Sequence, residues 1–327
     1  MPGALWVERL CSGTELAAGP FRDRARHAGG CLIHVLAYEK SDMLTVVVML
    51  SGAHRFDMLE TALASIPIES PHVTQVILRH QGGPWDWGGK LRERMESHPK
   101  VRVLEFPDKV DFAASYNRTL DRVETPWALM LPDDDFLLRG AAAASFDALA
   151  AYPDSLGYGF VAFGWYYLKD GRYLASYVKR RGLNAALHYT PKLVSSLLNV
   201  QRVRQIGGFD GSVGGFDDTV LFGRLAYEFD ALVGATPIGV YRMHEGQESA
   251  RMQSVYAPYV KALMESLGRY ARDPREREEF EHHLADYVQG RDRPAMTLLQ
   301  ELTFRFRSQS HPQDVHSIAD IRRWSTV

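Results

Sequence analysis

The chain has 327 residues, of which 24% are charged and 46% belong to the hydrophobic set, a composition typical of globular proteins rather than disordered or fibrous ones. Its formal net charge of -2 provides no basic field to gather phosphate backbones, which argues against nucleic acid as a partner. At this length we expect one large α/β domain with additional segments, or two domains.

The cysteines and the N-terminal segment bear on the location of the protein. Cys11 and Cys31 are too few for a disulfide scaffold in a chain of this length, and they lack the spacing of a zinc site. Charged residues interrupt the N-terminal apolar stretch, so we expect no signal peptide. No stretch approaches the ~20 apolar residues that cross a bilayer. We therefore expect a cytoplasmic protein without a transmembrane segment, whose membrane contact would be peripheral.

Regular alternation of strands and helices begins after residues 1–43, which form an expected N-terminal extension. The valine-rich run from Leu44 to Leu50 is typical of a strand that is buried on both faces of a parallel sheet. Apolar residues at helical spacing follow it, and Pro67 ends that helix. Further strands are expected over residues 73–78, 101–106 and 127–131. Because helical stretches separate these strands, they predict a mostly parallel sheet that helices flank.

The second half of the chain has a different pattern. An aromatic run over 158–168 is followed by Asp170-Gly171 and a second strand pattern over 173–178, which predicts an antiparallel hairpin beside the parallel sheet. Beyond residue 250, apolar residues recur at helical spacing and predict a helical C-terminal region. The expected division is an N-terminal extension, one α/β domain and a helical region, over residues 1–43, 44–250 and 251–327.

Three consecutive aspartates, Asp133, Asp134 and Asp135, follow the fourth expected strand. Their charges repel one another, which costs stability unless a cation neutralises them. Ligands bind at the carboxyl ends of strands in open α/β sheets, and hard oxygen ligands suit Mg²⁺ or Mn²⁺. The triplet therefore predicts a metal site. The alternative is a solvated acidic turn that caps the next helix.

Asp217 and Asp218 form a second acidic cluster, which precedes apolar residues at helical spacing. One interpretation is that these carboxylates cap the helix by accepting hydrogen bonds from amides of its first turn. The other is that one of them is a general base, which faces the metal site across a cleft and takes a proton from an attacking hydroxyl. The residues alone leave both interpretations open.

The order of these motifs resembles the family 2 glycosyltransferases of the GT-A fold, over roughly residues 45–249. The first strand and its turn are similar to the family's first strand and nucleotide-binding turn, which places Ser51, Gly52 and Arg55 at the nucleotide. Of the family's usual turn sequence only the arginine is kept. The resemblance thus implies a GT-A glycosyltransferase domain over 44–250.

Two further motifs of the first half support this resemblance. Asn117-Arg118 occupies the place of an Asn-Arg pair that precedes the next strand, which implies that both residues contact the donor. The aspartate triplet looks like the family's DxD-type motif. By the resemblance, Asp133 and Asp135 would hold the metal, and Asp133 and Asp134 would also contact the donor.

The later half carries the strongest local match. Residues 199–210 resemble the family's segment that ends in Gly-Gly-Phe-Asp and leads into the acceptor side of the site. Asp217-Asp218 stands where the family usually has Glu-Asp, so the resemblance makes Asp218 the candidate catalytic base. Many relatives carry a histidine at the position of His244 that helps to bind the metal or the diphosphate.

One departure concerns the nucleotide base. The turn after the second strand usually offers the base an acidic residue, whereas this chain reads Leu78-Arg79-His80-Gln81. We place His80 at this contact, but the substitution leaves the base open.

The resemblance implies a metal-dependent inverting glycosyltransferase that uses Mn²⁺ or Mg²⁺ and moves a sugar from a nucleotide-diphosphate donor, preferably a UDP-sugar, to an unknown acceptor hydroxyl. A sugar-nucleotide nucleotidyltransferase is one rival, although the first turn lacks the glycine-rich basic loop that such enzymes use. A non-catalytic nucleotide-sugar-binding protein is the other, because a fold by itself does not determine function. For the C-terminal region, packing on the catalytic domain, a homodimer contact and contact with an anionic membrane all stay open.

Overall fold

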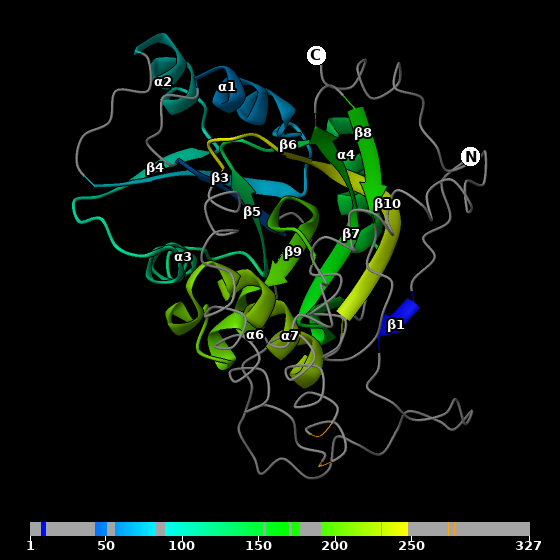
Figure 1. The fold of residues 1–327 in the computed structure, drawn as a ribbon. Coiled ribbons are helices and arrows are strands. Elements are labelled where there is room, and N and C mark those ends of the chain that lie inside the picture. The colour runs from blue at the N-terminus through cyan, green and yellow to red at the C-terminus, as the bar shows by residue number, and fades with distance from the viewer. Residues whose placement is uncertain are drawn as a thin grey trace.

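The structure is a computed structural model, and Figure 1 shows its fold as a ribbon. It describes residues 8–10, 43–50, 56–82, 89–152, 155–169, 172–176, 191–229 and 231–247, together with the isolated helical positions Pro274 and Glu278. The expected C-terminal helical region and most of the expected N-terminal extension lie outside the described residues. In the described part of the chain, no helix is long and apolar enough to span a bilayer.

A single mixed sheet organises the described residues (Figure 1). Its strand order is β1-β10-β7-β9-β5-β2-β3-β4, with β6 paired to β10 and β8 paired to β7. The strands are β1 (Glu8–Leu10), β2 (Leu44–Met49), β3 (Val73–Gln81), β4 (Val101–Phe106), β5 (Trp127–Pro132), β6 (Phe136–Leu137), β7 (Phe160–Lys169), β8 (Arg172–Ser176), β9 (Ser196–Asn199) and β10 (Ala231–Arg242).

The first half of the sheet is parallel, as the sequence predicts. Strands β4, β3, β2 and β5 lie side by side in that order and run in the same direction. Every residue of β2 is buried, because helices cover both faces of the sheet at this strand. The residue pairing between strands places Arg79 of β3, Met49 of β2 and Pro132 of β5 on one line at the carboxyl edge of the sheet.

The second half of the sheet is mixed. Strand β9 is antiparallel to both of its neighbours, β5 and β7, and so joins the two halves. The predicted hairpin is present, since β7 and β8 pair antiparallel from Trp165 and Ser176 to Lys169 and Arg172. Strand β10, which the sequence pattern did not reveal, runs parallel to β7 and reaches the carboxyl edge at Arg242.

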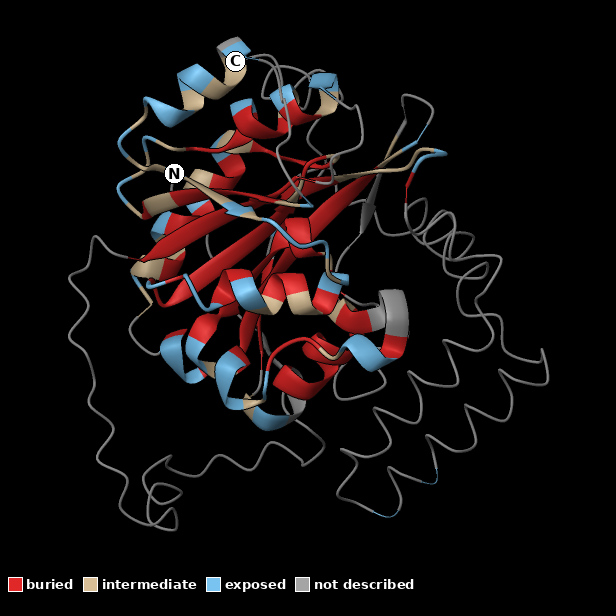
Figure 2. Cartoon of the chain, turned by 90° about the vertical axis from the view of Figure 1, so that its left-hand side faces the viewer, coloured by how far each residue is buried: buried red, intermediate tan, exposed pale blue. Residues whose placement is uncertain are grey.

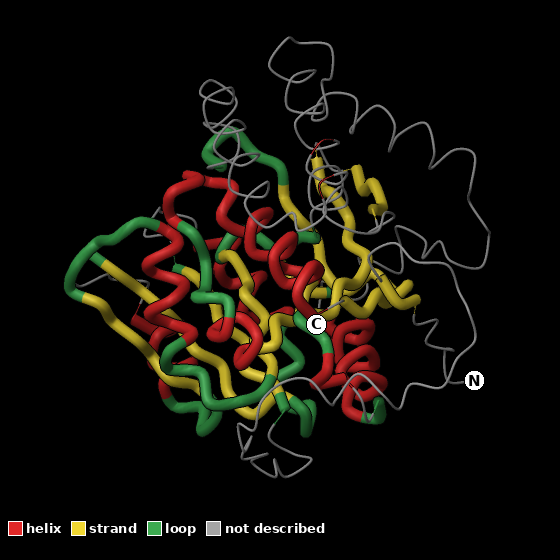
Figure 3. Tube along the Cα trace, turned by 90° about the horizontal axis from the view of Figure 1, so that it is seen from below, coloured by secondary structure: helices red, strands yellow, loops and turns green. Residues whose placement is uncertain are grey.

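Helices cover both faces of the sheet. The α-helices are α1 (Phe56–Ser65), α2 (Gly89–Glu96), α3 (Phe112–Leu120), α4 (Arg139–Ala150), α6 (Val200–Gln205) and α7 (Asp217–Phe229). The described residues also include the short 3-10 helices η2 (Ser155–Gly157), η3 (Leu193–Ser195) and η4 (Gly211–Phe216). Figure 1 shows α1 and α2 above the sheet and α3, α6 and α7 below it, and Figure 3 shows the lower layer from its own side.

Two hydrophobic cores lie on opposite faces of the sheet, because side chains alternate along each strand. On one face, Val46 and Leu78 pack with Leu59 of α1 and Phe146 of α4. On the other face, Val47 and Ile77 pack with Tyr116 of α3, Val203 of α6 and Phe222 of α7. Figure 2 shows the buried strands in red between helices that are exposed only on their outer sides.

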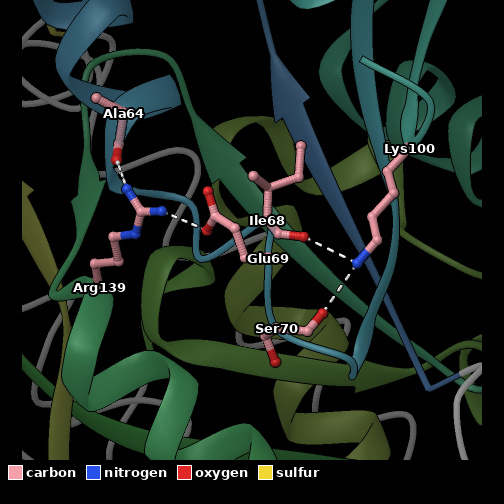
Figure 4. Close-up of polar contacts among 6 residues, drawn as sticks. All are labelled: Ala64, Ile68, Glu69, Ser70, Lys100 and Arg139. Carbon is pink, nitrogen blue, oxygen red and sulfur yellow. Dashed lines mark hydrogen bonds and ion pairs between the residues drawn. The ribbon is translucent and has the colours of Figure 1, made fainter.

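The connection that follows α1 is held by two cations from other parts of the chain (Figure 4). Arg139 at the start of α4 pairs with the carboxylate of Glu69 and donates a hydrogen bond to the Ala64 carbonyl. The ammonium of Lys100 donates to the carbonyls of Ile68 and Ser70 at 2.9 and 3.0 Å. Arg139 thus satisfies a carbonyl in the last turn of α1, and Lys100 satisfies two carbonyls of the connection beyond Pro67.

Candidate active site

The aspartate triplet lies where the sequence predicts it, directly after β5 at the carboxyl edge of the sheet. Asp133 and Asp135 are buried, with 3% and 1% of their surface exposed. The triplet contacts the end of β10. The backbone amide of Arg242, which is 107 residues from Asp135 in the sequence, donates a hydrogen bond to Asp135 Oδ1 at 2.9 Å. Burial, and then the charge of Asp134, raise the pKa of Asp135 well above its usual range, while the Arg242 amide opposes this shift.

Asp134 and His244 lie in direct contact, with 3.1 Å between Asp134 Oδ2 and His244 Nε2. Two ligands that each bind one octahedral ion at ~2.1 Å and at a right angle lie roughly 3 Å apart. A carboxylate oxygen with an imidazole nitrogen is a donor set that suits Mn²⁺. In the described part of the chain, no three His, Cys, Asp or Glu side chains form a complete metal cluster. The pair therefore fits two positions of a divalent ion whose remaining ligands would come from elsewhere.

The second acidic cluster begins α7, which packs on the face of the sheet that bears Val47 and Ile77. Asp217 is 6% exposed, and Asp218 is half-buried. The Asp218 amide donates to Asp217 Oδ1 at 3.0 Å, and the Thr219 amide donates to Asp218 Oδ1 at 2.6 Å. The side chains thus hydrogen-bond amides of the first helical turn, which is the structural interpretation that the sequence left open.

Both carboxylates of this second cluster are held in an environment that favours their neutral forms. Burial, and then the adjacent charge of Asp218, raise the pKa of Asp217 to about 7. Burial also raises the pKa of Asp218, although the charge of Lys192 and the hydrogen bonds from Thr219 oppose the shift. A carboxyl group with a raised pKa at the edge of a sheet is the kind of group that general acid–base catalysis uses.

Tyr116 of α3 shows that the two acidic clusters share one environment. Burial raises the pKa of the Tyr116 hydroxyl, and the charges of Asp217, Asp218 and Asp134 raise it further, while Arg79 opposes them. Charges from both clusters therefore act on one buried hydroxyl. The start of α7 therefore lies near the end of β5, although the two clusters are about 80 residues apart in the sequence.

Lys192 is a member of this site that the sequence did not single out. It precedes η3, and its ammonium lies 5.0 Å from the centroid of the Tyr241 ring. Burial lowers the pKa of Lys192, but Tyr167, Tyr241 and the carboxylates of Asp218 and Asp135 raise it by more, so that the net shift is upward. Because carboxylates of both clusters act on it, Lys192 supplies positive charge between them. No motif surrounds it that would have revealed this position.

Asn117 holds a loop in place, a role that the sequence did not suggest. Its Nδ2 donates to the Phe209 carbonyl at 3.0 Å, and its Oδ1 accepts from the Phe209 amide at 2.8 Å. Gly207 and Gly208 precede this contact with φ of 82° and 79°, values that side chains other than glycine rarely adopt. The Gly-Gly-Phe motif is thus a turn that Asn117 clamps. The predicted donor contact Arg118 is exposed, and its charge helps to lower the pKa of Arg79.

The three residues at the end of β3 have different surroundings. Gln81 is occupied, because its amide group donates to the Val110 carbonyl and accepts from the Val110 amide. His80, a predicted nucleotide contact, is 5% exposed and lies on the strand face of Leu78, which packs with α1 and α4. Arg79 lies on the opposite face, toward Tyr116 and α3, and burial lowers its pKa to about 10. The predicted nucleotide contacts Ser51, Gly52 and Arg55 lie outside the described residues.

No protein-family model matches the chain, and no curated protein matches it in sequence. Among solved structures, S. aureus TarS 1-349 in complex with UDP-GlcNAc aligns with a TM-score of 0.56 and 13% sequence identity over 75% of this chain and 71% of that chain. The mannosyltransferase PcManGT from Pyrobaculum calidifontis, in complex with GDP-Man and Mn²⁺, aligns with a TM-score of 0.53 and 16% identity over 86% of this chain and 83% of that chain. The chain has a GT-A-type fold. At sequence identities this low, the similarity establishes the fold alone. This fold is the one that the sequence predicted.

Proposed function

We propose that this GT-A-type protein is a metal-dependent inverting glycosyltransferase that moves a sugar from a nucleotide-diphosphate donor to an acceptor hydroxyl. The observation that carries the proposal is the presence of two acidic clusters, Asp133–Asp135 and Asp217–Asp218, in one environment around Tyr116. The fold adds support, because TarS and PcManGT were solved with UDP-GlcNAc and with GDP-Man and Mn²⁺ respectively. A UDP-sugar is the preferred donor, with a GDP-sugar as the alternative.

Asp218 is the proposed catalytic base. An acceptor hydroxyl that attacks the anomeric carbon must lose its proton as the bond to the leaving diphosphate breaks. Asp218 stands at the start of α7, and Lys192 keeps a positive charge near it that favours the ionised, proton-accepting form. Attack from the face opposite the leaving group inverts the stereochemistry at the anomeric carbon.

A divalent ion, Mn²⁺ or Mg²⁺, would neutralise the negative charge that develops on the leaving diphosphate. Asp133, Asp135 and His244 are the proposed ligands, and the contact of Asp134 with His244 adds Asp134 to this set. Asp133 and Asp134 would also orient the donor, and Ser51, Gly52, Arg55, His80, Asn117 and Arg118 remain proposed donor contacts. Of these, Asn117 would act through the loop that it clamps.

The substitution Asp218→Asn tests the proposed function. We expect the variant to bind a nucleotide sugar with Mn²⁺ as tightly as the wild type does, because the change leaves the triplet intact. Its turnover should fall by roughly 10²- to 10⁴-fold, which is the usual contribution of a general base. Calorimetry gives the binding constant, and release of nucleoside diphosphate in the presence of candidate acceptors gives the rate.

Asp121→Asn is the control, because Asp121 is exposed at the end of α3 and belongs to neither acidic cluster. It should retain most of the turnover. Near-normal turnover of the Asp218→Asn variant would remove Asp218 from the role of base. Metal-dependent binding without turnover in the wild type would instead support the non-catalytic binding protein, and transfer of a nucleotidyl group would support the nucleotidyltransferase.

A further inference from the structure

Arg79 is a buried cation, two of whose three guanidinium nitrogens have no partner among the described residues. Only 3% of its surface is exposed, and its Nε and Nη2 atoms are buried without a hydrogen-bond partner in the described structure. No ion pair to a described carboxylate is found for this side chain. An unpaired buried charge is costly, so its retention in a native structure needs an explanation, and a ligand that completes it is one.

The position of Arg79 identifies the place where such a ligand would bind. Arg79 lies on the same strand face as Ile77, which packs against Tyr116 of α3 in the core below the sheet. Along the carboxyl edge it is level with Met49, and Met49 is level with Pro132, the residue before the aspartate triplet. Neighbouring strands lie about 4.8 Å apart, so Arg79 is roughly 10 Å from the end of β5 along this edge.

The chemistry of the side chain limits the ligand group. Guanidinium has five N–H donors and no acceptor, so it cannot take an N–H group of a nucleotide base. It pairs best with an anionic oxygen group, above all with phosphate, to which it donates two parallel hydrogen bonds. The acidic residue that this turn usually carries in family 2 glycosyltransferases would do the reverse, since it accepts hydrogen bonds. Gln81 cannot replace it, because both of its polar atoms are bound to Val110.

We propose that Arg79 binds the nucleoside-proximal phosphate of the donor through the buried Nε and Nη2 donors, on the side of the site away from the aspartate triplet. The inference rests on the proposed function, because it assumes a nucleoside diphosphate donor. A nucleoside diphosphate placed along the edge of the sheet spans from the metal-binding side at β5 to the arginine at β3. The donor would thus be held at both ends by opposite means: carboxylates with a cation at one end, and a fixed guanidinium at the other.

The substitution Arg79→Met gives the proposal two independent readouts. Methionine fills a similar volume without a charge, so we expect the ligand-free variant to melt at the same temperature as the wild type or a higher one. Its affinity for UDP, GDP and inorganic pyrophosphate, each with Mn²⁺, should fall by roughly 10- to 100-fold, which is the loss of one bidentate charged contact. Arg79→Lys, which keeps the charge without the fork, should lose less affinity than Arg79→Met.

Arg102→Met is the control, because Arg102 is exposed on the adjacent strand β4. It should bind all three probes as the wild type does. The proposal fails if Arg79→Met binds the probes as tightly as the wild type, or if it loses UDP but not pyrophosphate, which would indicate a contact to base or ribose.

A large drop in the melting temperature of both Arg79 variants would show a structural role and would also overturn the proposal. These outcomes leave the proposed function intact. If the wild type binds none of the nucleoside diphosphates, however, the proposed function fails and the inference fails with it.

Discussion

Some side chains in and near this site have structural roles that the sequence motifs do not predict. Asn117 belongs to an Asn-Arg pair that resembles a donor contact, yet both of its polar atoms bind the backbone of Phe209. Arg224 of α7 supports the same loop, since it donates to the carbonyls of Gly208 and Ile206. The loop that leads to the second acidic cluster is therefore held from α3 and from α7.

Gly208→Ala should destabilise the protein, because Gly208 has a φ of 79° and an added Cβ would overlap Asn117 Oδ1. The left-handed conformation alone costs roughly 1–2 kcal/mol for a residue with a Cβ, and displacement of Asn117 adds to that cost. Urea unfolding measures the change. Gly140→Ala is the control, because Gly140 lies exposed in α4 with open space around its Cβ position. A stability of Gly208→Ala equal to that of this control would contradict the proposed clamp.

At the scale of elements, helix α7 delivers carboxylates to the site at a cost in stability. Its first residues, Asp217 and Asp218, are adjacent, buried or half-buried, and like-charged. Asp217 therefore has a pKa of about 7 in the folded protein. Below this pH it holds a proton, which removes the repulsion between the two carboxylates.

Asp217→Asn should stabilise the protein at high pH. The folded pKa lies above the unfolded value, so the folded state binds this proton more tightly and loses stability as the pH rises from about 4 to 7. An asparagine has no proton to lose, so the variant should gain roughly 1–4 kcal/mol over the wild type above pH 7 and little near pH 4. Urea unfolding across this pH range measures the difference, with Asp108→Asn at an exposed position as the control. A pH-independent difference would refute the raised pKa.

At the scale of the whole molecule, the site lies where the two halves of the sheet meet. The triplet follows β5 of the parallel half, while Lys192 and His244 come from the segments next to β9 and β10 of the mixed half. Strand β9 joins these halves through antiparallel pairing with β5 and β7. A ligand that contacted both halves at this junction would add its binding free energy to the stability of the whole sheet.

We therefore expect nucleotide and metal together to raise the melting temperature. At a concentration of 100 times Kd, a ligand that binds only the folded state stabilises it by about 2.7 kcal/mol. A thermal-shift series with UDP-sugars and GDP-sugars, with Mn²⁺ and with a chelator, measures the effect and identifies the donor. His244→Ala should reduce the metal-dependent part of the shift, since His244 contacts Asp134. A shift that is equal with Mn²⁺ and with chelator would contradict the proposed metal dependence.

The sequence by itself determined the parallel half of the fold, because there the signals are local. Buried runs such as Leu44 to Leu50 and the proline after α1 predict a strand and a helix end without reference to distant residues. The Asp-Gly pair likewise predicted the hairpin of β7 and β8, and the strand before the triplet placed Asp133–Asp135 at the edge of the sheet.

Only the tertiary structure decided which distant residues act together. The contact of Asp134 with His244 joins residues 110 positions apart, and it depends on β10 lying beside β7 and β6. Lys192 enters the site because of sheet order and the covering helices, which no short motif encodes. For the same reason, Nε and Nη2 of Arg79 are buried without a partner in the part of the chain that the structure describes. Strand pairing, burial and the resulting shifts in pKa are properties of the assembled sheet. They therefore cannot be predicted from short segments of the sequence.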